Sequence, residues 1–336
     1  MSNILFLGDP HLQFSRFDAA KKFLKWVDEV VDQYKPDLVV NLGDTFHEHA
    51  ILRSEIVSEF SSHVKRVSEK VPYLYVLGNH DMAKPLDATY HALQAFKDIY
   101  PNLTVVDSIL HRKDLGITFV PFQPNHTTFP TETLPICIAH QTFVGCDFGG
   151  YRPDDGVDPD KISAELIVSG HIHMKQAFGK VFYPGSPYSQ SMKDIGQIKG
   201  LSILDTDTYK IQFLQSPLPS WHSLEVAVSD IKSTIAVVRN SINDNDNWVV
   251  VFTGPRKEIA AVFDSKEWKK LCGKSRISTR TKYIDSDRVE RIKIKAHTVT
   301  DVVEEYVDRV YAGGVDKGLI KKTMRQLFDN LDKNSV

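Results

Sequence analysis

Short apolar runs that each end in a glycine and a polar residue recur through the first third of the chain. Three such runs have the length of a strand: residues 4–7 ending at Gly8-Asp9, 38–42 ending at Gly43-Asp44, and 72–77 ending at Gly78-Asn79. Residues 17–31 and 51–67, which lie between these runs, carry apolar positions at helical spacing. The three polar residues follow one another at intervals of 35 residues. Strand, loop and helix repeated at this length predict βαβ units and a mainly parallel sheet.

From about residue 103 the apolar runs become shorter and are separated by Gly, Pro and Asp. We predict seven short strands here: residues 103–106, 117–120, 136–139, 166–168, 180–183, 201–204 and 211–214. We expect them to form a second, more antiparallel sheet that packs on the first. Residues 1–215 are therefore predicted to be an α/β sandwich of two sheets.

The remaining chain predicts two smaller parts. The segment Ser216-Pro217-Leu218-Pro219-Ser220 has the composition of a linker. We predict that this linker begins a small α/β domain over residues 216–297, called the cap domain below, with strands at 224–228 and 248–252 and helices at 230–239 and 257–266. Residues 298–336 are predicted to be a C-terminal segment of two helices, 299–311 and 317–331, separated by Gly313-Gly314.

Composition places the chain among ordinary soluble globular proteins. Of 336 residues, 42% are hydrophobic and 25% are charged, which is enough apolar material for a sizeable core. The three cysteines are too few and too scattered for a disulfide framework, so they favour a reducing compartment. We find no signal peptide and no apolar stretch of the roughly 20 residues that a membrane helix needs. We therefore expect a cytoplasmic protein with no membrane partner.

Asp, Asn and His gather directly after the predicted strands. Five motifs occur in this order: Gly8-Asp9-Pro10-His11, Gly43-Asp44-Thr45-Phe46-His47, Gly78-Asn79-His80-Asp81, His140, and Gly170-His171-Ile172-His173. Open α/β sheets bind ligands just beyond the carboxyl ends of their strands, so these side chains are expected to converge. Oxygen donors mixed with imidazole, without thiolate, suit Mn²⁺, Fe²⁺ or Zn²⁺.

The donors suffice for two cations about 4 Å apart if one carboxylate bridges them. Asp44 is the best candidate for the bridge, because it lies on the middle of the three evenly spaced loops. The other candidate ligands divide into two sets: Asp9, His11 and His173 for one cation, and Asn79, His140 and His171 for the other. We expect Gly170-His171-Ile172-His173 to be extended, so that its two histidines point the same way and reach neighbouring cations.

A paired metal site of this kind predicts hydrolysis of a phosphate ester. Two divalent cations would activate a shared water molecule and neutralise the attacked phosphate. The leaving oxygen still needs a proton, and His80 is our candidate for the general acid, with Asp81 orienting its ring. Each motif taken singly has an ordinary structural explanation, such as a turn or a helix N-cap. A turn or a cap does not explain why all five motifs occur, each directly after a predicted strand.

The five motifs resemble those of the calcineurin-like metallophosphoesterase superfamily, which read D-x-H, G-D, G-N-H-D/E, H and G-H-x-H. Within it, Gly43-Asp44-Thr45-Phe46-His47 is similar to the double-strand-break repair nucleases of the SbcD type, in which a histidine at the position of His47 acts in exonuclease cleavage. The turn Tyr183-Pro184-Gly185-Ser186-Pro187 also resembles a glycine-serine turn of that family, although a plain turn explains it equally well.

This resemblance implies a metal-dependent exo/endodeoxyribonuclease, most simply a Mn²⁺ enzyme with Mg²⁺, Fe²⁺ or Zn²⁺ as alternatives. It implies a subunit that acts on duplex ends and single strands of DNA in recombination, repair or replication. The expected partners are a coiled-coil ABC ATPase of the SbcC type and a second copy of the chain, forming a homodimer within a heterotetramer. The length is similar to that of phage-encoded versions, so the host cytoplasm is the expected location.

Charge is unevenly distributed in a way that favours a nucleic-acid substrate. Residues 255–300 contain thirteen Lys or Arg and six Asp or Glu, a net charge of +7 against −9 for the rest of the chain. Such a segment suits sequence-independent binding of a phosphate backbone, and Trp268 and Tyr283 would add stacking. The alternative is a solvated charged face.

Two alternatives to a nuclease subunit remain at this point. The first is another calcineurin-like phosphatase or phosphodiesterase, and the second is a DNA-end-binding scaffold with little turnover. The C-terminal residues Ile320, Met324, Leu327 and Leu331 form an apolar stripe at helical spacing, with Leu319 and Phe328 beside it. This stripe would either pack on its own domain or dock on the ATPase, and the resemblance favours docking.

Overall fold

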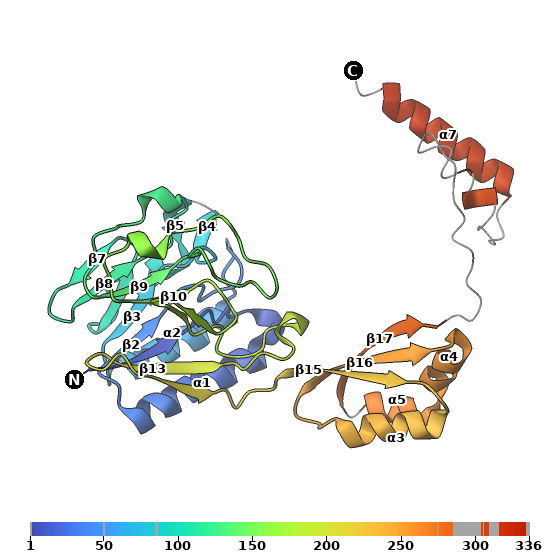
Figure 1. Ribbon diagram of the computed structural model, residues 1–336, viewed down its shortest axis with the longest axis horizontal. Coiled ribbons are helices and arrows are strands. Elements are labelled where there is room, and N and C mark those ends of the chain that lie inside the picture. Colours follow the sequence, from blue (N-terminus) through green and yellow to red (C-terminus); the bar gives the residue numbers. More distant parts are fainter. Residues whose placement is uncertain are drawn as a thin grey trace. The chain divides into compact units, whose positions relative to one another are not determined.

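A computed structural model of the chain describes residues 2–49, 51–84, 87–273, 275–284, 304, 306–308 and 316–333, with side chains up to residue 326. Figure 1 shows the helices and strands along the chain. Residues 2–215 contain two six-stranded sheets, and a further three-stranded sheet follows them. Among the described residues, no helix is both long enough and apolar enough to cross a membrane.

The first sheet contains the evenly spaced strands of the sequence pattern. Its strand order is β14-β13-β1-β2-β3-β6. The bounds are β1 Asn3–Leu7, β2 Leu38–Asn41, β3 Tyr73–Val76, β6 Leu103–Val106, β13 Gly200–Asp205 and β14 Ile211–Gln215. Strands β1, β2, β3 and β6 are parallel, whereas β13 pairs antiparallel with both β1 and β14. The predicted parallel arrangement of the first three strands is confirmed.

Helices α1 (Phe17–Tyr34) and α2 (Ser54–Ser68) cover one face of this sheet. Side chains alternate along a strand, so β1 contributes to two cores. Leu5 and Leu7 pack in the core that contains the apolar residues of α1 and α2. Ile4 packs in a second core, between the two sheets. Both faces of the sheet are therefore buried, which explains why its strands are continuous apolar runs.

The second sheet packs on the opposite face of the first, and this confirms the predicted two-sheet α/β sandwich. Its strand order is β11-β12-β10-β9-β8-β7. The bounds are β7 Leu110–Arg112, β8 Ile117–Val120, β9 Ile136–His140, β10 Leu166–Gly170, β11 Gln176–Phe178 and β12 Val181–Tyr183. Phe119 and Ile138 point into the core between the sheets, and Cys137 and Ile167 point into a third core on the outer face.

The prediction that the second sheet is more antiparallel is wrong. Strands β8, β9, β10 and β12 are all parallel, and only the edge strands β7 and β11 are antiparallel. Parallel neighbours need a long crossover, which is usually an α-helix. Here residues 121–135 and 141–165 make the crossovers with only the 3₁₀ helices η3 (His126–Thr128) and η4 (Pro159–Lys161). The sequence between these strands therefore shows no helical pattern, and this is why their parallel direction was not predicted.

The assignment of strands to the second sheet also needs correction. Strands β6, β13 and β14 belong to the first sheet, because β6 pairs with β3 and β13 pairs with β1. The short elements outside the two sheets are η1 Phe14–Arg16, β4 Met82–Lys84, β5 Asp87–His91, η2 Ala92–Phe96 and η5 Met192–Asp194.

The cap is a three-stranded sheet, ordered β15-β16-β17, with three helices. Its elements are β15 Trp221–Ala227, α3 Ile231–Ser241, β16 Asn247–Gly254, α4 Arg256–Asp264, α5 Lys266–Cys272 and β17 Arg276–Tyr283. The helices and strands share a core of buried apolar residues. Strand β17 was not predicted, because it is mostly polar and basic and has only Ile277 packed against this core.

Trp268 does not serve as a stacking platform for nucleic acid, contrary to the prediction. Its side chain is 5% exposed and lies edge-on to Phe252, with 5.1 Å between the ring centroids. Tyr283, by contrast, is 49% exposed and lies under the guanidinium of Arg256. Of the basic residues predicted to bind phosphate, Lys274, Arg288, Arg291, Lys293 and Lys295 lie outside the described residues.

At the C-terminal end, helix α7 (Lys317–Lys333) matches the second predicted helix. Residues 304 and 306–308 are helical, and the rest of the predicted helix 299–311 and Gly313-Gly314 lie outside the described residues. Lys321 of α7 forms an ion pair with Asp308. The side chains of Leu327, Phe328 and Leu331 also lie outside the described part, so the docking role of the stripe stays a prediction. The same holds for the domain borders at 215/216 and 297/298.

Candidate metal centre

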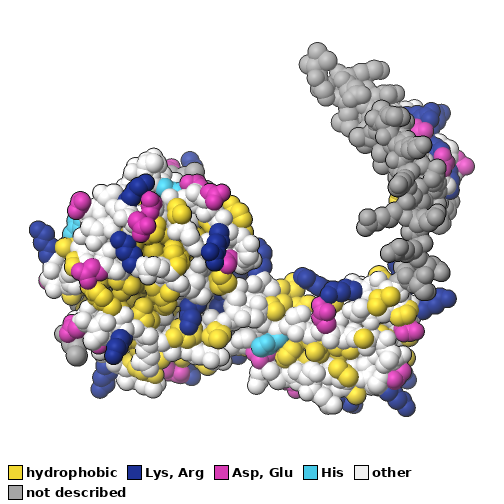
Figure 2. Space-filling model, viewed as in Figure 1, with side chains coloured by type: hydrophobic (Ala, Val, Ile, Leu, Met, Phe, Trp, Pro, Cys, Tyr) yellow, Lys and Arg dark blue, Asp and Glu magenta, His cyan; other side chains and the backbone are white. Residues whose placement is uncertain are grey.

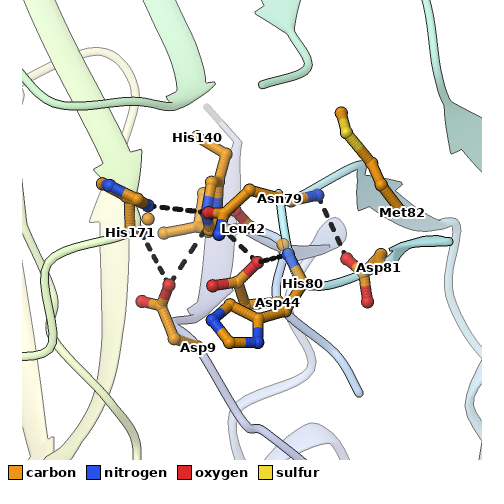
Figure 3. Close-up of polar contacts among 12 residues, drawn as sticks. Asp9, Leu42, Asp44, Asn79, His80, Asp81, Met82, His140 and His171 are labelled. Atoms are coloured by element: carbon orange, nitrogen blue, oxygen red, sulfur yellow. Dashed lines mark hydrogen bonds and ion pairs between the residues drawn. The ribbon is translucent and has the colours of Figure 1, made fainter. Parts of the chain in front are cut away.

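The loops that follow five parallel strands meet at one edge of the sandwich. Strands β1, β2 and β3 of the first sheet and β9 and β10 of the second end there, and each is followed by residues of one motif. Figure 3 shows Asp9, Asn79, His140 and His171 around Asp44. These side chains are up to 162 residues apart in sequence, for example where the backbone amide of His171 donates to Asp9 Oδ1 at 2.6 Å.

The first donor set consists of Asp9, His11 and His173. One ligand atom from each lies within 4.8 Å of the others. The Nε2 atoms of His11 and His173 face each other at 2.9 Å. Asp9 Oδ2 is buried and has no hydrogen-bond partner among the described residues. Two imidazole nitrogens and an unpaired carboxylate oxygen around one point are the donors expected of a cation site.

The second donor set consists of Asn79, His140 and His171. Asn79 Oδ1 lies 2.9 Å from His171 Nδ1 and 3.1 Å from His140 Nε2. The two ring nitrogens are 3.3 Å apart. A second compact group of one oxygen and two nitrogens therefore lies beside the first.

Asp44 lies between the two sets and presents one carboxylate oxygen to each. Its Oδ2 is 3.5 Å from His11 Nε2, and its Oδ1 is 3.3 Å from His140 Nε2. The side chain of Asp44 is 3% exposed, so it lies within the protein. A carboxylate in this position can bind two cations at once.

Protonation of the histidines in the metal-free protein follows from burial and from the carboxylates. Burial lowers the pKa of His11 well below its ordinary value. Burial and then the charge of His140 lower the pKa of His171 to about 3. Burial also acts to lower the pKa of His140, but the charge of Asp44, its hydrogen bond and Asp9 outweigh this effect and raise the pKa to about 9. His11 and His171 are thus neutral and keep a lone pair for a cation.

The donors fit two divalent cations of the Mn²⁺, Fe²⁺ or Zn²⁺ type. The buried, unpaired Oδ2 of Asp9 is costly unless a positive group lies beside it, and imidazole nitrogens converge on the same place. The groups of candidate ligands among the described residues contain no cysteine. The chemistry of the donor set is therefore that of an open catalytic site rather than a closed thiolate site.

Three of these residues have an unusual backbone conformation. His11, Asp44 and His171 have positive φ values of 44°, 49° and 84°. Such a conformation costs about 1–3 kcal/mol in a residue other than glycine and is concentrated at functional sites. It also corrects one expectation, because the chain at His171 is not extended. The two histidines of that motif turn to different donor sets, His171 toward Asn79 and His173 toward His11.

Close packing of glycines brings the loops together. A Cβ atom on Gly78 would lie 2.2 Å from the backbone nitrogen of Asp44 and 2.3 Å from its Oδ1. A Cβ atom on Gly8 would lie 2.0 Å from the carbonyl oxygen of Gly185, in the glycine-serine turn. Only glycine allows these approaches.

His80 lies at the edge of the candidate metal centre. Its ring is 4.7 Å from the ring of His11, and its backbone amide donates to Asp44 Oδ1 at 2.8 Å. Its Nδ1 lies 2.8 Å from the carbonyl oxygen of His47. The ring is thus oriented by a backbone carbonyl on the neighbouring loop.

Asp81 does not orient His80 as we expected. Its two oxygens accept hydrogen bonds from the backbone amides of Phe46 and Gly78, each at 3.1 Å. Burial and the nearby charge of Asp44 raise the pKa of Asp81 to about 7. Among its described contacts, Asp81 therefore ties the loops after β2 and β3 together rather than assisting His80.

His47 lies beside the first donor set. Its Nδ1 is 3.4 Å from His11 Nδ1, and one ligand atom from each of His11, His47 and His80 lies within 4.8 Å of the others. The sequence interpretation missed His49, whose ring stacks on His80 with 4.5 Å between centroids. Its place two residues after His47 was the available signal.

An open cleft of about 850 Å³ leads to the donor sets. Its lining includes His47, His171 and His173 together with Arg16, Phe148 and Lys193. The last three were not predicted, because an isolated cation or aromatic residue in a loop carries no sequence signal. A cleft with cations at its wall suits a substrate that carries phosphate.

Comparison with known proteins agrees with this geometry. Residues 2–175 match the sequence profile of a family described as calcineurin-like phosphoesterase. "Putative phosphoesterase 078R" of Invertebrate iridescent virus 3 is 23% identical over 285 residues, which cover 80% of this chain and 81% of the viral protein. "Putative phosphoesterase 244L" of Invertebrate iridescent virus 6 is 27% identical over 256 residues, covering 69% and 88%. Exonuclease subunit 1 of Enterobacteria phage T4 is 22% identical over 234 residues, covering 65% and 69%.

Proposed function

Because the chain belongs to the calcineurin-like phosphoesterase family, we propose that it is a Mn²⁺-dependent nuclease subunit that hydrolyses phosphodiester bonds of DNA at its ends. The observation that carries this proposal is the position of Asp44, with one oxygen toward each donor set. In our proposal Asp9, His11 and His173 hold one cation, and Asn79, His140 and His171 hold the other.

Each residue of the centre has a role in this proposal. Two divalent cations bound there would lower the pKa of a shared water molecule to about 7 and neutralise the attacked phosphate. His80 in its imidazolium form donates Nδ1–H to the carbonyl of His47, so that Nε2–H is left for the leaving oxygen. His47 contacts His11 and assists exonuclease cleavage.

Two features support DNA as the substrate. Arg276 and Arg280 alternate with Ile277 along β17, so they point away from the core of the cap and are exposed. Figure 2 shows Lys and Arg side chains on the side of the cap where Figure 1 labels β17. Such a face suits the phosphate backbone. The similarity to a phage protein named exonuclease subunit 1 supports a nucleic-acid substrate.

We further propose that the chain works as a homodimer with a coiled-coil ABC ATPase of the SbcC type. Helix α7 supports this role, because Leu319 at its start is 57% exposed. An apolar side chain on the surface of a helix can enter a groove of a partner protein.

Cleavage of end-labelled DNA tests the proposal. The wild-type chain is incubated with linear duplex and single-stranded DNA, labelled at the 5′ or the 3′ end, in Mn²⁺ or Mg²⁺ and with or without an ATPase of this type. We expect Mn²⁺-dependent cleavage, its loss in His80→Asn, and unchanged DNA binding by that variant. His111→Asn, at the exposed position of the edge strand β7, serves as the control.

The same assay separates the alternatives. Hydrolysis of a phosphopeptide or a cyclic nucleotide in preference to DNA would identify a different phosphatase or phosphodiesterase. DNA binding without cleavage in Mn²⁺ or Mg²⁺, and also in Fe²⁺ or Zn²⁺, would identify an end-binding scaffold.

A further inference from the structure

A buried ion pair lies next to the first donor set and has no part in the chemistry described so far. Lys199 Nζ is 2.7 Å from Asp194 Oδ1, and the two side chains are 2% and 5% exposed. Burying two charges is costly, and the pair alone seldom repays the cost in stability. Its contacts therefore need a different explanation.

Lys199 holds the backbone of a candidate ligand. Its Nζ donates to the carbonyl oxygen of His173 at 2.8 Å, and also to Gln197 Oε1 at 2.8 Å. The same carbonyl accepts the backbone amide of Ser186 at 3.0 Å. The Ser186 hydroxyl also donates to it, at 3.5 Å. These donors fix the orientation of the peptide group that follows the His173 side chain.

Asp194 reaches the other loop of the first donor set through Gln190. Asp194 Oδ2 accepts the backbone amide of Gln190 at 2.7 Å and that of Ser191 at 3.0 Å. Gln190 Nε2 in turn donates to the carbonyl oxygen of Asp9 at 2.7 Å. The guanidinium of Arg16 donates to the carbonyl oxygen of Gln190. One connected network thus contacts the backbones of both Asp9 and His173.

The network is directed to one half of the candidate metal centre. The carbonyls that it holds belong to Asp9 and His173, both in the first donor set. His140, of the second donor set, is instead held by the carbonyl oxygen of Leu42 at 2.7 Å from its Nδ1. The network itself contacts the first donor set, and the hydrogen bond from the His171 amide to Asp9 Oδ1 links that set to the second.

We propose that Lys199 and Asp194 are positioning residues for the first cation, acting through the backbones of His173 and Asp9. This inference rests on the proposed two-cation function. Residues that orient the ligands of a metal change its affinity by about 10–100-fold when they are replaced. Loss of the network should thus lower the affinity for the cation of the first donor set more than the affinity for the other cation.

Manganese binding and spin coupling test this inference. The variant Lys199→Met/Asp194→Asn removes both charges, so neither is left buried alone, and Gln190→Met removes a neutral link of the same network. We expect each variant to bind the Mn²⁺ of the first donor set at least about tenfold more weakly than wild type, as measured by titration calorimetry. We also expect electron paramagnetic resonance to show isolated Mn²⁺ in place of the coupled pair. Lys161→Met, which breaks an exposed ion pair with Asp158, is the control.

The melting temperature of each metal-free variant, measured alongside, establishes that it is folded. Folded variants that keep both affinities and the coupled signal would overturn the inference, and so would an equal loss at both cation sites. If the double variant does not fold, Gln190→Met alone decides between these results. A wild-type chain that binds no Mn²⁺ would instead contradict the proposed function, so the two failures are distinguishable.

Discussion

The two oxygens of Asp44 face different histidines, His11 and His140, and this position makes the side chain difficult to replace. In Asp44→Asn one of these oxygens becomes an amide nitrogen, which donates rather than accepts. We expect turnover of bis(p-nitrophenyl) phosphate to fall by about 10³-fold, as when a directly stabilising group is removed from an active site. Asp158→Asn, on the surface, should have no effect. Turnover of Asp44→Asn within tenfold of wild type would contradict a bridging role.

The raised pKa of His140 predicts that binding of the cations releases a proton. Its pKa of about 9 in the metal-free protein means that it is protonated at pH 7.5, and a cation can bind Nε2 only after that proton has left. Affinity for Mn²⁺ should therefore increase as the pH rises toward 9 and level off above it. Calorimetry in buffers of different ionisation enthalpy would measure about one proton released from this histidine. No release at pH 7.5 would show that the ring is already neutral.

The sequence was enough to predict which residues form the candidate site, but not which contacts their side chains make. Motifs after strand ends pointed to the seven side chains that the structure brings together, because metal chemistry restricts the choice of donor. The role of Asp81 was wrong, because adjacency to His80 in sequence does not give the direction of a side chain. Trp268 was wrong for a similar reason: a tryptophan among lysines can be buried in a small core, and only the fold reveals this.

At the scale of elements, the approach of two loops depends on Gly78. The added methyl group in Gly78→Ala would meet both the backbone and the carboxylate of Asp44. We expect a loss of about 1–3 kcal/mol in the free energy of unfolding, measured in urea, together with weaker Mn²⁺ binding. Gly273→Ala is the control, since its Cβ would have ordinary contacts of 3.5 Å or more. Wild-type stability and binding in Gly78→Ala would show that the loops can move apart.

The sheets show which features of elements the sequence reveals. Strands of the first sheet alternate with helices, so their direction could be predicted. Strands of the second sheet are joined by irregular crossovers, and short apolar runs carry no information about direction. Strand β17 was missed because an edge strand with one apolar contact lacks the alternation of a half-buried strand.

At the scale of the whole molecule, the basic face of the cap predicts salt-dependent binding of DNA. Arg276→Gln/Arg280→Gln should weaken duplex binding for all sequences and reduce the slope of log affinity against log salt by about two. Hydrolysis of bis(p-nitrophenyl) phosphate should be unchanged. Lys113→Gln/Lys210→Gln, at two exposed positions outside the basic segment, is the matched control. An unchanged slope in the arginine variant would place the DNA elsewhere.

The left-handed backbone conformation of His11, Asp44 and His171 lowers stability at the positions that the proposed activity requires. Glycine adopts this conformation without the steric penalty, so His171→Gly should raise the melting temperature of the metal-free protein while it abolishes hydrolysis. A lineage released from the need to cleave its substrate would be free to accept such changes. Glycine at these three positions in a relative would therefore mark a chain that has kept the architecture and given up the chemistry.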